Sequence, residues 1–353
     1  MTDSAFATEY VKTSTLHTTG IIELDRPRAL NSLNVDMFGA IDEALEKWAS
    51  DDRVHRIIIR STNPTAFCAG GDMKLFREHA VNGDHDFGDY GLAREYDMNE
   101  LIAHYAKPIV ALIDGICMGG GLGISVHGSH RVITEKGWMS MPEMAIGFAP
   151  DTGVTYMTQR MAGEYGPSSA LAAFIGLTGY RMTPADCLWS GLATDFVRSE
   201  DLDSFAEMVI SESLDEARER YVDNDAAGTS RVAGMISAIE ECFAGDTWAD
   251  IDAALDAHAD TEFVDFVRDL QSNANPASLV ATAELYTANR SARDIREALD
   301  NEFAVGALLR REPNFLEGVR AVLVDKDRDP HFDPSATDTV DPTPYRGALG
   351  IQA

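Results

Sequence analysis

The sequence predicts an α/β fold with a largely parallel sheet, followed by a mainly helical C-terminal region. Strand-like and helix-like stretches alternate in the first half of the chain, and that order requires crossover connections between parallel strands. Two strand-like runs, residues 56–60 and 108–113, are almost continuously apolar, which is typical of strands buried on both faces. From about Gly179 onward the sequence changes to long helical patterns rich in Ala, Glu, Asp and Arg. We therefore divide the chain into residues 1–200 and residues 201–353.

Five elements are expected in the first half of the chain. Short apolar runs predict strands, and longer helical patterns predict helices. In order, the expected elements are strand 18–24, helix 37–49, strand 57–60, helix 93–105 and strand 109–113. Residues 80–94 are rich in Gly and Asp, which predicts a mobile loop. In the second half, breaks are expected at Pro184, Gly228, Gly245, Pro276 and Pro313, with a surface loop at 223–228 and an irregular end at 333–344.

The composition predicts a packed globular protein that does not bind nucleic acid. Its 353 residues are 45% apolar, which is enough for a real core. The formal net charge of -29 disfavours nucleic-acid binding, because phosphate contacts need clustered Lys and Arg. No apolar run approaches the roughly 20 residues that span a membrane, and the N-terminus lacks the pattern of a signal or transit peptide. The four cysteines have no paired spacing, so reduced thiols and a cytoplasmic location are expected.

Two glycine-rich loops follow two of the expected strands. Residues 65–72 come after strand 57–60, and residues 119–121, three glycines, come after strand 109–113. Both loops are expected at the carboxyl edge of the sheet, where ligands bind in open α/β folds. Bare glycines let a ligand approach the backbone amides closely, and free amides in the first turn of a helix suit a developing oxyanion. Taken alone, the glycine run is also typical of a flexible turn or a tight packing point.

Two acids, Glu143 and Asp151, follow the second glycine loop. A Glu after a Pro is usually a solvated residue in the first turn of a helix, and an Asp before Thr-Gly is usually an N-cap or turn residue. The alternative is acid–base chemistry beside the free amides. His127 lies in an apolar stretch and is expected to be a core histidine, and Asp72 is expected to cap a helix at residues 73–79. No spacing of His, Cys and Asp suggests a metal site, so no metal is expected.

Several segments together resemble the crotonase (enoyl-CoA hydratase/isomerase) superfamily in their order and spacing. They are residues 26–33 (RPRALNSL), 66–72 (AFCAGGD), 107–108 (KP), 114–115 (DG), 118–121 (MGGG) and 142–147 (PEMAIG). The resemblance implies an α/β fold with a crotonase-type ββα spiral core, formed by residues 1–200, that holds an acyl-CoA thioester. It also implies that the thioester oxygen lies between two backbone N–H groups, which match Gly71 and Gly120. The helical residues 201–353 would cover the site and could mediate oligomerisation.

The position three residues after Gly120 distinguishes the branches of this superfamily. Hydratases carry a second glutamate there, in addition to the one that matches Glu143, and here that position is Gly123. Glycine has no proton to exchange, so the hydration mechanism lacks an acid–base group that is typically worth about 10²–10⁴ in rate. Asp151, downstream of Glu143, instead resembles the 3-hydroxyisobutyryl-CoA hydrolases of valine breakdown. Glu95 matches a glutamate that this branch places at its substrate site, and residues 177–181, 191–194 and 314–327 also resemble this branch.

The resemblance implies hydrolysis of a short 3-hydroxyacyl-CoA thioester, most simply 3-hydroxyisobutyryl-CoA to 3-hydroxyisobutyrate and CoA. Gly71 and Gly120 would stabilise the oxyanion, while Glu143 either attacks the carbonyl to give an anhydride or activates water as a general base. Asp151 would hydrogen-bond the substrate 3-hydroxyl or position water, with Glu95 assisting. Two other functions stay open: an enoyl-CoA hydratase or isomerase acting on another acyl-CoA, and a catalytically weak acyl-CoA-binding protein.

The partner implied by the resemblance is an acyl-CoA, and no separate cofactor is expected because coenzyme A is part of the substrate. The nearest candidates for binding CoA are Arg26, Arg28, Ala29, Leu30 and Lys74. Arg320 or Lys326 in the C-terminal region could reach a neighbouring phosphate. The resemblance leaves both a monomer and a homo-oligomer open.

Overall fold

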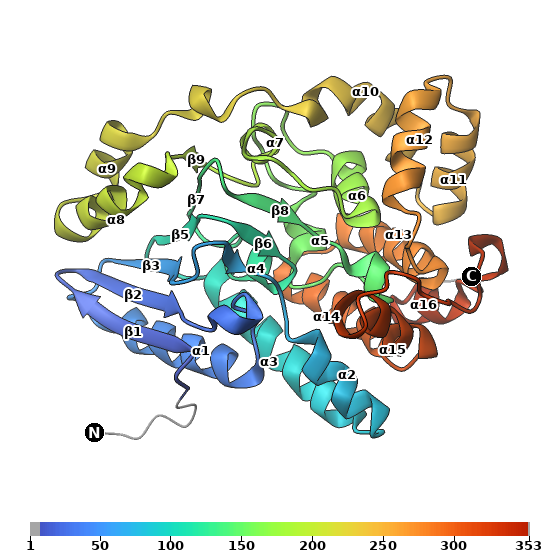
Figure 1. The fold of residues 1–353 in the computed structure, drawn as a ribbon, viewed down its shortest axis with the longest axis horizontal. Coiled ribbons are helices and arrows are strands. Elements are labelled where there is room, and N and C mark those ends of the chain that lie inside the picture. Colours follow the sequence, from blue (N-terminus) through green and yellow to red (C-terminus); the bar gives the residue numbers. More distant parts are fainter. Residues whose placement is uncertain (1–7, 352–353) are drawn as a thin grey trace.

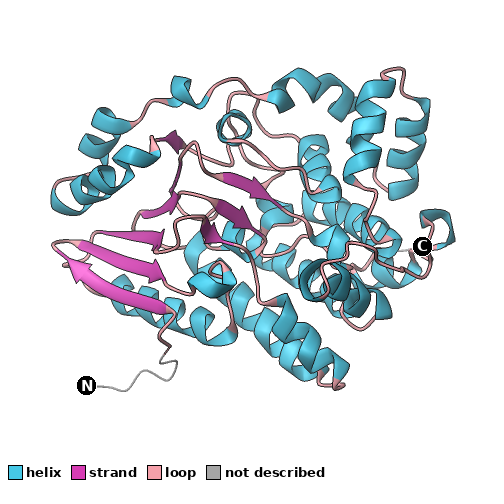
Figure 2. Cartoon of the chain, viewed as in Figure 1, coloured by secondary structure: helices cyan, strands magenta, loops and turns pink. Residues whose placement is uncertain are grey.

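The computed structural model describes residues 8–351 and contains two β-sheets (Figures 1 and 2). The larger sheet has six strands, which are in spatial order β1 (Val11–Leu16), β2 (Thr19–Leu24), β3 (Arg56–Ser61), β5 (Ile109–Ile113), β7 (His130–Ile133) and β9 (Asp195–Phe196). The smaller sheet has three strands, β4 (Ala66–Cys68), β6 (Ile116–Met118) and β8 (Trp138–Ser140). Every neighbouring pair is parallel except β1 with β2. The predicted, largely parallel sheet is therefore confirmed.

Three successive pairs of strands alternate between the two sheets, and this alternation makes the core a spiral. The chain runs from β3 to β4, from β5 to β6 and from β7 to β8, so each turn contributes one strand to each sheet. In the larger sheet Ile58 pairs with Val110, and in the smaller sheet Cys68 pairs with Cys117. Because the strands of the smaller sheet are parallel, the loops that follow β4, β6 and β8 leave it at the same edge.

The longer helices of the spiral part begin at side-chain caps that the sequence supplies. The helices of this part are α1 (Val35–Ala49), α2 (Met73–Val81), α3 (His85–Ala103), α4 (Gly120–Gly123), α5 (Val154–Met157), α6 (Ser169–Thr178) and α7 (Pro184–Ser190), with 3-10 turns η1 (Pro27–Ala29) and η2 (Glu143–Ile146). Helices α1, α2, α3, α6 and α7 have such caps. Asp72 caps α2 by accepting a hydrogen bond from the Leu75 amide, as predicted. Asn34 caps α1 in the same way through the Met37 amide.

The predicted mobile loop at residues 80–94 is wrong. Helix α3 begins at His85, eight residues before the expected helix, and Asp84 caps it by accepting a hydrogen bond from Phe87 N. The two glycines that suggested a loop are packing points instead. A Cβ on Gly91 would lie 2.7 Å from the Phe76 ring, and a Cβ on Gly88 would collide with the guanidinium of Arg310. Small residues here allow α2 and a C-terminal arginine to approach α3 closely.

The C-terminal part is helical, as predicted. Its elements are η3 (Ser199–Asp201), α8 (Leu202–Ser211), α9 (Leu214–Tyr221), η4 (Asn224–Ala227), α10 (Arg231–Phe243), α11 (Trp248–Ala257), α12 (Thr261–Leu270), α13 (Pro276–Arg290), α14 (Ile295–Leu309), α15 (Pro313–Val319), the π-helical turn η5 (Arg320–Val324), η6 (Thr337–Thr339) and α16 (Thr343–Ala348). Pro184, Pro276 and Pro313 each occupy the first turn of a helix, where the missing N–H has no intrahelical acceptor to lose.

Two C-terminal helices pack directly on the spiral core. Helix α14 contacts α3 and α5, and α13 contacts α5 and α6; both helices are orange in Figure 1 and lie to the right of the centre. One apolar cluster includes Ile59 of β3, Leu122 of α4 and Leu299 of α14 and therefore extends across both parts of the chain. Within residues 8–351, no helix has the length and apolar character needed to span a bilayer.

Candidate active site

The two glycine loops meet beside the smaller sheet. They follow β4 and β6, which pair in parallel, so both loops leave the same edge. A Cβ built on Gly120 would lie 3.4 Å from the amide nitrogen of Gly71, which places the two backbones in contact. Among the described residues, neither of these two amides donates a hydrogen bond. Two free N–H groups therefore stand next to each other, which is the arrangement that an oxyanion requires.

The three glycines of the second loop have different neighbours. Gly119 adopts φ +47°, and a Cβ there would lie 3.0 Å from Oε1 of Glu143. Gly120 opens α4 and faces the carboxyl of Glu95. Gly121 packs on the preceding loop, because a Cβ there would lie 2.5 Å from the carbonyl oxygen of Cys68. The alternative of a tight packing point thus describes Gly121, whereas Gly119 and Gly120 border the acidic side chains.

Three carboxyl groups converge on these loops, and all three are buried. Glu143 opens η2 directly after Pro142 and is 6% exposed, Asp151 is 4% exposed and Glu95 of α3 is 2% exposed. Oε2 of Glu143 and Oε1 of Glu95 have no hydrogen-bond partner among the described residues. Asp151 accepts a hydrogen bond of 2.8 Å from the hydroxyl of Tyr96. A solvated helix start for Glu143 is therefore excluded. Asp151 is not an N-cap, because Gly153 precedes α5, but it does begin a turn, since its carbonyl accepts a hydrogen bond from Val154 N at 3.1 Å.

Burial and mutual repulsion favour the protonated forms of these acids. Burial is the main cause that raises the pKa of Glu143 well above its usual range, and the charge of Asp151 adds to it. Burial also raises the pKa of Glu95, followed by the charges of Asp151 and Glu143. Burial raises the pKa of Asp151 to about 7, although the hydrogen bond from Tyr96 opposes the shift. Ionisation of one of these groups disfavours ionisation of the others, and acids with raised pKa values are suited to proton exchange near neutral pH.

Position 123 has no room for a side chain. A Cβ on Gly123 would lie 2.8 Å from Cβ of Thr152 and 3.0 Å from Oδ1 of Asn99. Asn99 is fully buried, and neither atom of its amide group has a partner in the part of the chain that the structure describes. The space that a second acid would take is thus filled by Thr152 and by a polar group without a partner.

Sequence reasoning missed Asn99 and Tyr96 as site residues. Both follow Glu95 on α3, and Asn99 lies four residues after it, on the same helix face. That spacing could have identified Asn99, but the sequence of the expected helix at 93–105 does not indicate which of its faces points into the site.

The prediction that His127 is a core histidine with its hydrogen bonds satisfied is confirmed in part. Its side chain is buried, Nε2 donates to the carbonyl of Thr152 at 2.7 Å, and burial lowers its pKa to about 4, but Nδ1 has no partner among the described residues.

The residues proposed to bind CoA lie close to the first glycine loop. The Leu30 carbonyl accepts a hydrogen bond from Ala69 N, which ties residues 26–31 to that loop. Arg28, Leu30 and Lys74 are exposed and Ala29 is half-buried. Arg26 is already engaged, because its guanidinium contacts Asp72 at 2.7 Å and donates to the Ser32 carbonyl.

Of the two C-terminal candidates, Arg320 is also engaged, and Lys326 is exposed. Arg320 pairs with Glu317, Asp325 and Asp327 on its own segment. Its charge is thus already neutralised by neighbouring acids.

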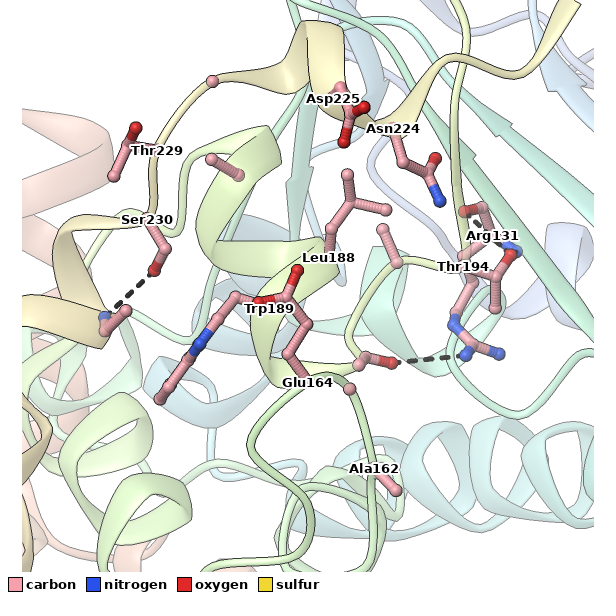
Figure 3. A pocket seen from close by; sticks show the side chains of 16 residues that line it. Arg131, Ala162, Glu164, Leu188, Trp189, Thr194, Asn224, Asp225, Thr229 and Ser230 are labelled. Carbon is pink, nitrogen blue, oxygen red and sulfur yellow. Dashed lines mark hydrogen bonds between the residues drawn. The ribbon is translucent and has the colours of Figure 1, made fainter.

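A separate pocket of about 710 Å³ lies between α7 and η4 (Figure 3). None of the three buried acids lines it. Arg131, which reaches into this pocket, donates to the carbonyls of Gly128, Gly191 and Leu192. Its guanidinium therefore holds the surrounding loops, and the pocket is distinct from the acidic site.

The sequence profile of the enoyl-CoA hydratase/isomerase family matches residues 19–348. The chain belongs to this family. The "3-hydroxyisobutyryl-CoA hydrolase, mitochondrial" of Xenopus laevis is 34% identical over 330 residues, which cover 91% of this chain and 83% of that protein. The protein of the same name from Homo sapiens is 34% identical over 328 residues, which cover 90% of this chain and 82% of that protein.

Two solved structures of this family share the fold over nearly the whole chain. A carnitinyl-CoA dehydratase from Mycobacterium thermoresistibile has a TM-score of 0.88 and 32% identity, and covers 97% of this chain and 96% of its own. An enoyl-CoA hydratase from Rhodobacter sphaeroides has a TM-score of 0.86 and 36% identity, and covers 97% of both chains. The predicted crotonase-type spiral with a helical C-terminal region is therefore confirmed.

Proposed function

We propose that the protein hydrolyses a short 3-hydroxyacyl-CoA thioester, most simply 3-hydroxyisobutyryl-CoA, and releases 3-hydroxyisobutyrate and CoA. The observation that carries this proposal is the filled space at position 123. Hydration in this family uses two acid–base groups, and here position 123 is a glycine at which even a Cβ would crowd Thr152 and Asn99. The names of the similar Xenopus and human proteins support the same reaction.

In the proposed mechanism, the thioester oxygen accepts hydrogen bonds from the amides of Gly71 and Gly120. Negative charge collects on this oxygen as the tetrahedral intermediate forms, and each such donor is typically worth about 10²–10³ in rate. Glu143 must first lose the proton that burial favours, and its carboxylate then either attacks the thioester carbon, giving an anhydride and CoA thiolate, or removes a proton from an attacking water. In the first route, water then cleaves the anhydride and regenerates the Glu143 carboxylate.

Asp151 and Glu95 would act on the acyl group and on the attacking water. Asp151 accepts a hydrogen bond from Tyr96, which leaves its second oxygen for a substrate hydroxyl or a water. Glu95 lies beside both glycine loops, because a Cβ on Gly71 would be 4.0 Å from its Oε2. A protonated Glu95 can donate its proton to the CoA thiolate, which needs one on leaving. Its raised pKa favours that protonated form.

The second candidate function is an enoyl-CoA hydratase or isomerase, which the names of the two similar structures favour. One assay separates the candidates. The protein is incubated with 3-hydroxyisobutyryl-CoA, crotonyl-CoA and a 3-enoyl-CoA, and free thiol, hydration and double-bond migration are measured. We expect thiol release from the first substrate only, and none above background from a Glu143→Ala, Asp151→Ala double variant. Equal thiol release by that variant would refute hydrolysis, and binding without turnover would favour an acyl-CoA-binding protein.

A cytoplasmic location stays a prediction for this protein, and so does its oligomeric state, for which a monomer and a homo-oligomer both stay open. The names of the Xenopus and human relatives place those two proteins in mitochondria. Fractionation of the source cells and the mass of the purified protein in solution test the two predictions separately.

A further inference from the structure

A fourth buried carboxyl, Glu302, lies next to the proposed site but comes from the C-terminal helix α14. It is 1% exposed and accepts hydrogen bonds from the amide of Gly153 at 2.7 Å and the amide of Thr155 at 3.2 Å. The Thr155 hydroxyl donates a third, short hydrogen bond to the same carboxyl. These donors belong to the start of α5, so a residue almost 150 positions away satisfies amides that have no acceptor within α5.

The turn that Glu302 holds carries Asp151 and is strained. Thr152 adopts φ +60° and Gly153 adopts φ +77°, so two successive residues are left-handed. A β-branched residue in this conformation is strained and persists only where its surroundings impose it. His127 fixes the Thr152 carbonyl from the other side, and the Val154 amide donates to the Asp151 carbonyl at 3.1 Å. The direction of the Asp151 side chain therefore depends on contacts that keep this turn in place.

Helix α13 reinforces the same contact. Asn289 Nδ2 donates to the Thr155 hydroxyl oxygen at 2.6 Å, and Asn301 Nδ2 donates to Oδ1 of Asn289 at 2.8 Å. Asn289 is fully buried. The Thr155 hydroxyl thus accepts from Asn289 while it donates to Glu302, which fixes the orientation of both partners.

Charge alone does not explain why an acid is buried here. Burial raises the pKa of Glu302 to about 8, its three hydrogen bonds oppose that shift, and the charge of Asp151 raises the pKa further. No cation pairs with Glu302 among the described residues, so the carboxyl is retained at an electrostatic cost. The carboxyl has two acceptor oxygens, and these satisfy the three donors at this turn, which are the amides of Gly153 and Thr155 and the Thr155 hydroxyl.

We infer that Glu302 is a positioning residue of the active site, which holds the turn 151–155 from the C-terminal helical region so that Asp151 faces the substrate. The inference rests on the proposed function in so far as Asp151 takes part in turnover. Glu302 itself does not touch the reacting atoms. Its removal leaves two backbone amides without an acceptor and allows the strained turn to relax, which moves Asp151.

The test is a double-mutant cycle between Glu302 and Asp151. In the otherwise native protein, Glu302→Ala is expected to lower kcat about 10²-fold, the effect of a misplacement of about 1 Å, with little change in KM. Glu302→Gln keeps the size and one acceptor oxygen, so it should retain more activity than Glu302→Ala. In an Asp151→Asn background the same Glu302 substitutions should change kcat by less than about threefold, because the group they position is already lost.

Matched controls separate positioning from folding. Glu284→Gln replaces another buried glutamate, on α13, which contacts Arg346 and none of the proposed site residues. Glu284→Gln should leave kcat unchanged even if its melting temperature falls as much as that of Glu302→Gln. The inference is overturned if Glu302→Gln has native kcat, or if the Glu302 substitutions lower kcat equally in both backgrounds.

The cycle distinguishes this inference from the proposed function. If the native protein releases no CoA from 3-hydroxyisobutyryl-CoA, the proposed function fails. The same cycle is then measured on whichever acyl-CoA of the substrate panel the native protein converts. A native protein that converts none of them overturns both statements.

Discussion

The two parts of this chain contribute to the proposed site in different ways. The spiral core supplies the reactive groups at the ends of short strands: the free amides of two glycine loops, and the acids Glu143 and Asp151 after β8. In its described residues the helical region supplies no reactive group to the proposed site and instead supplies contacts to the turn beside it, chiefly from Glu302 and Asn289. The reactive groups therefore belong to local sequence motifs, whereas their positions depend on residues that are distant in sequence. Substitutions in the two parts should therefore affect activity and stability differently.

The largest effect is expected from Glu143→Gln in the spiral core. The amide cannot act as a nucleophile or a base, so kcat should fall by at least about 10²–10⁴, the range typical of a lost acid–base group. The fold should be retained or slightly stabilised, because the change removes an acid whose pKa burial raises. Rates of thiol release and melting temperatures, measured beside Glu284→Gln, check both points. Near-native turnover would remove Glu143 from the mechanism.

Adjacent glycines provide a paired test of the second loop. A Cβ on Gly120 would lie 3.4 Å from the Gly71 amide and against Glu95, in the space where the thioester oxygen is expected. Gly120→Ala should therefore lower kcat by about 10²–10³ while the fold is kept. A Cβ on Gly121 would lie 2.5 Å from the Cys68 carbonyl, so Gly121→Ala should destabilise the protein by about 1–3 kcal/mol. Urea unfolding and steady-state kinetics are measured for both variants. A Gly120→Ala variant with native kcat, or a Gly121→Ala variant with native stability, would contradict these different roles of the two glycines.

The sequence predicted the parts of the structure that local patterns determine. The strand Ile109–Ile113 was expected with the same bounds, because a continuous apolar run between polar residues leaves little choice of strand ends. The start of α3 was missed because Gly88 and Gly91, read as loop residues, are contacts with Arg310 and Phe76. Glycine is found both in loops and where helices approach closely, and sequence alone does not separate the two.

The proposed site divides in the same way. Gly71, Gly120, Glu143 and Asp151 belong to short motifs, and the structure brings them together with Glu95 on the neighbouring α3. Asn99 and Glu302 belong to no motif, because their partners lie in other segments of the chain. Burial of an acid without a cation depends on tertiary contacts, and the amphipathic pattern of a helix does not reveal them.

A smaller effect is expected from Tyr96→Phe, which removes the hydrogen bond to Asp151. That bond lowers the pKa of Asp151 against burial, which raises it to about 7. Without the bond the pKa should rise further, and the acid limb of the kcat profile should move to higher pH. A rise of one unit would reduce the ionised fraction near neutral pH up to about tenfold. Tyr105 lies just beyond the end of α3 and donates a hydrogen bond to the Leu45 carbonyl. The control variant Tyr105→Phe loses that bond and should leave the profile unchanged. An unshifted limb would mean that Asp151 does not need to ionise.

The smallest effect is a fall in stability as pH rises, and it depends on both parts of the chain. Burial raises the pKa values of Glu95, Glu143, Asp151 and Glu302, the last from 4.5 to about 8. Between these two values the folded chain binds more protons than the unfolded chain, so the free energy of unfolding decreases as pH increases. The melting temperature should therefore be lower at about pH 8 than at about pH 5.

Surface repulsion from the net charge of -29 acts in the same direction and must be separated from the buried acids. Salt screens exposed charges far more than buried ones, so the contribution of the buried acids should persist at about 1 M salt. Glu143→Gln and Glu302→Gln should each flatten the dependence on pH at both salt concentrations, because each removes one buried titrating group. A dependence that vanishes in salt, or that neither variant flattens, would mean that the buried carboxyls titrate as they do in the unfolded chain.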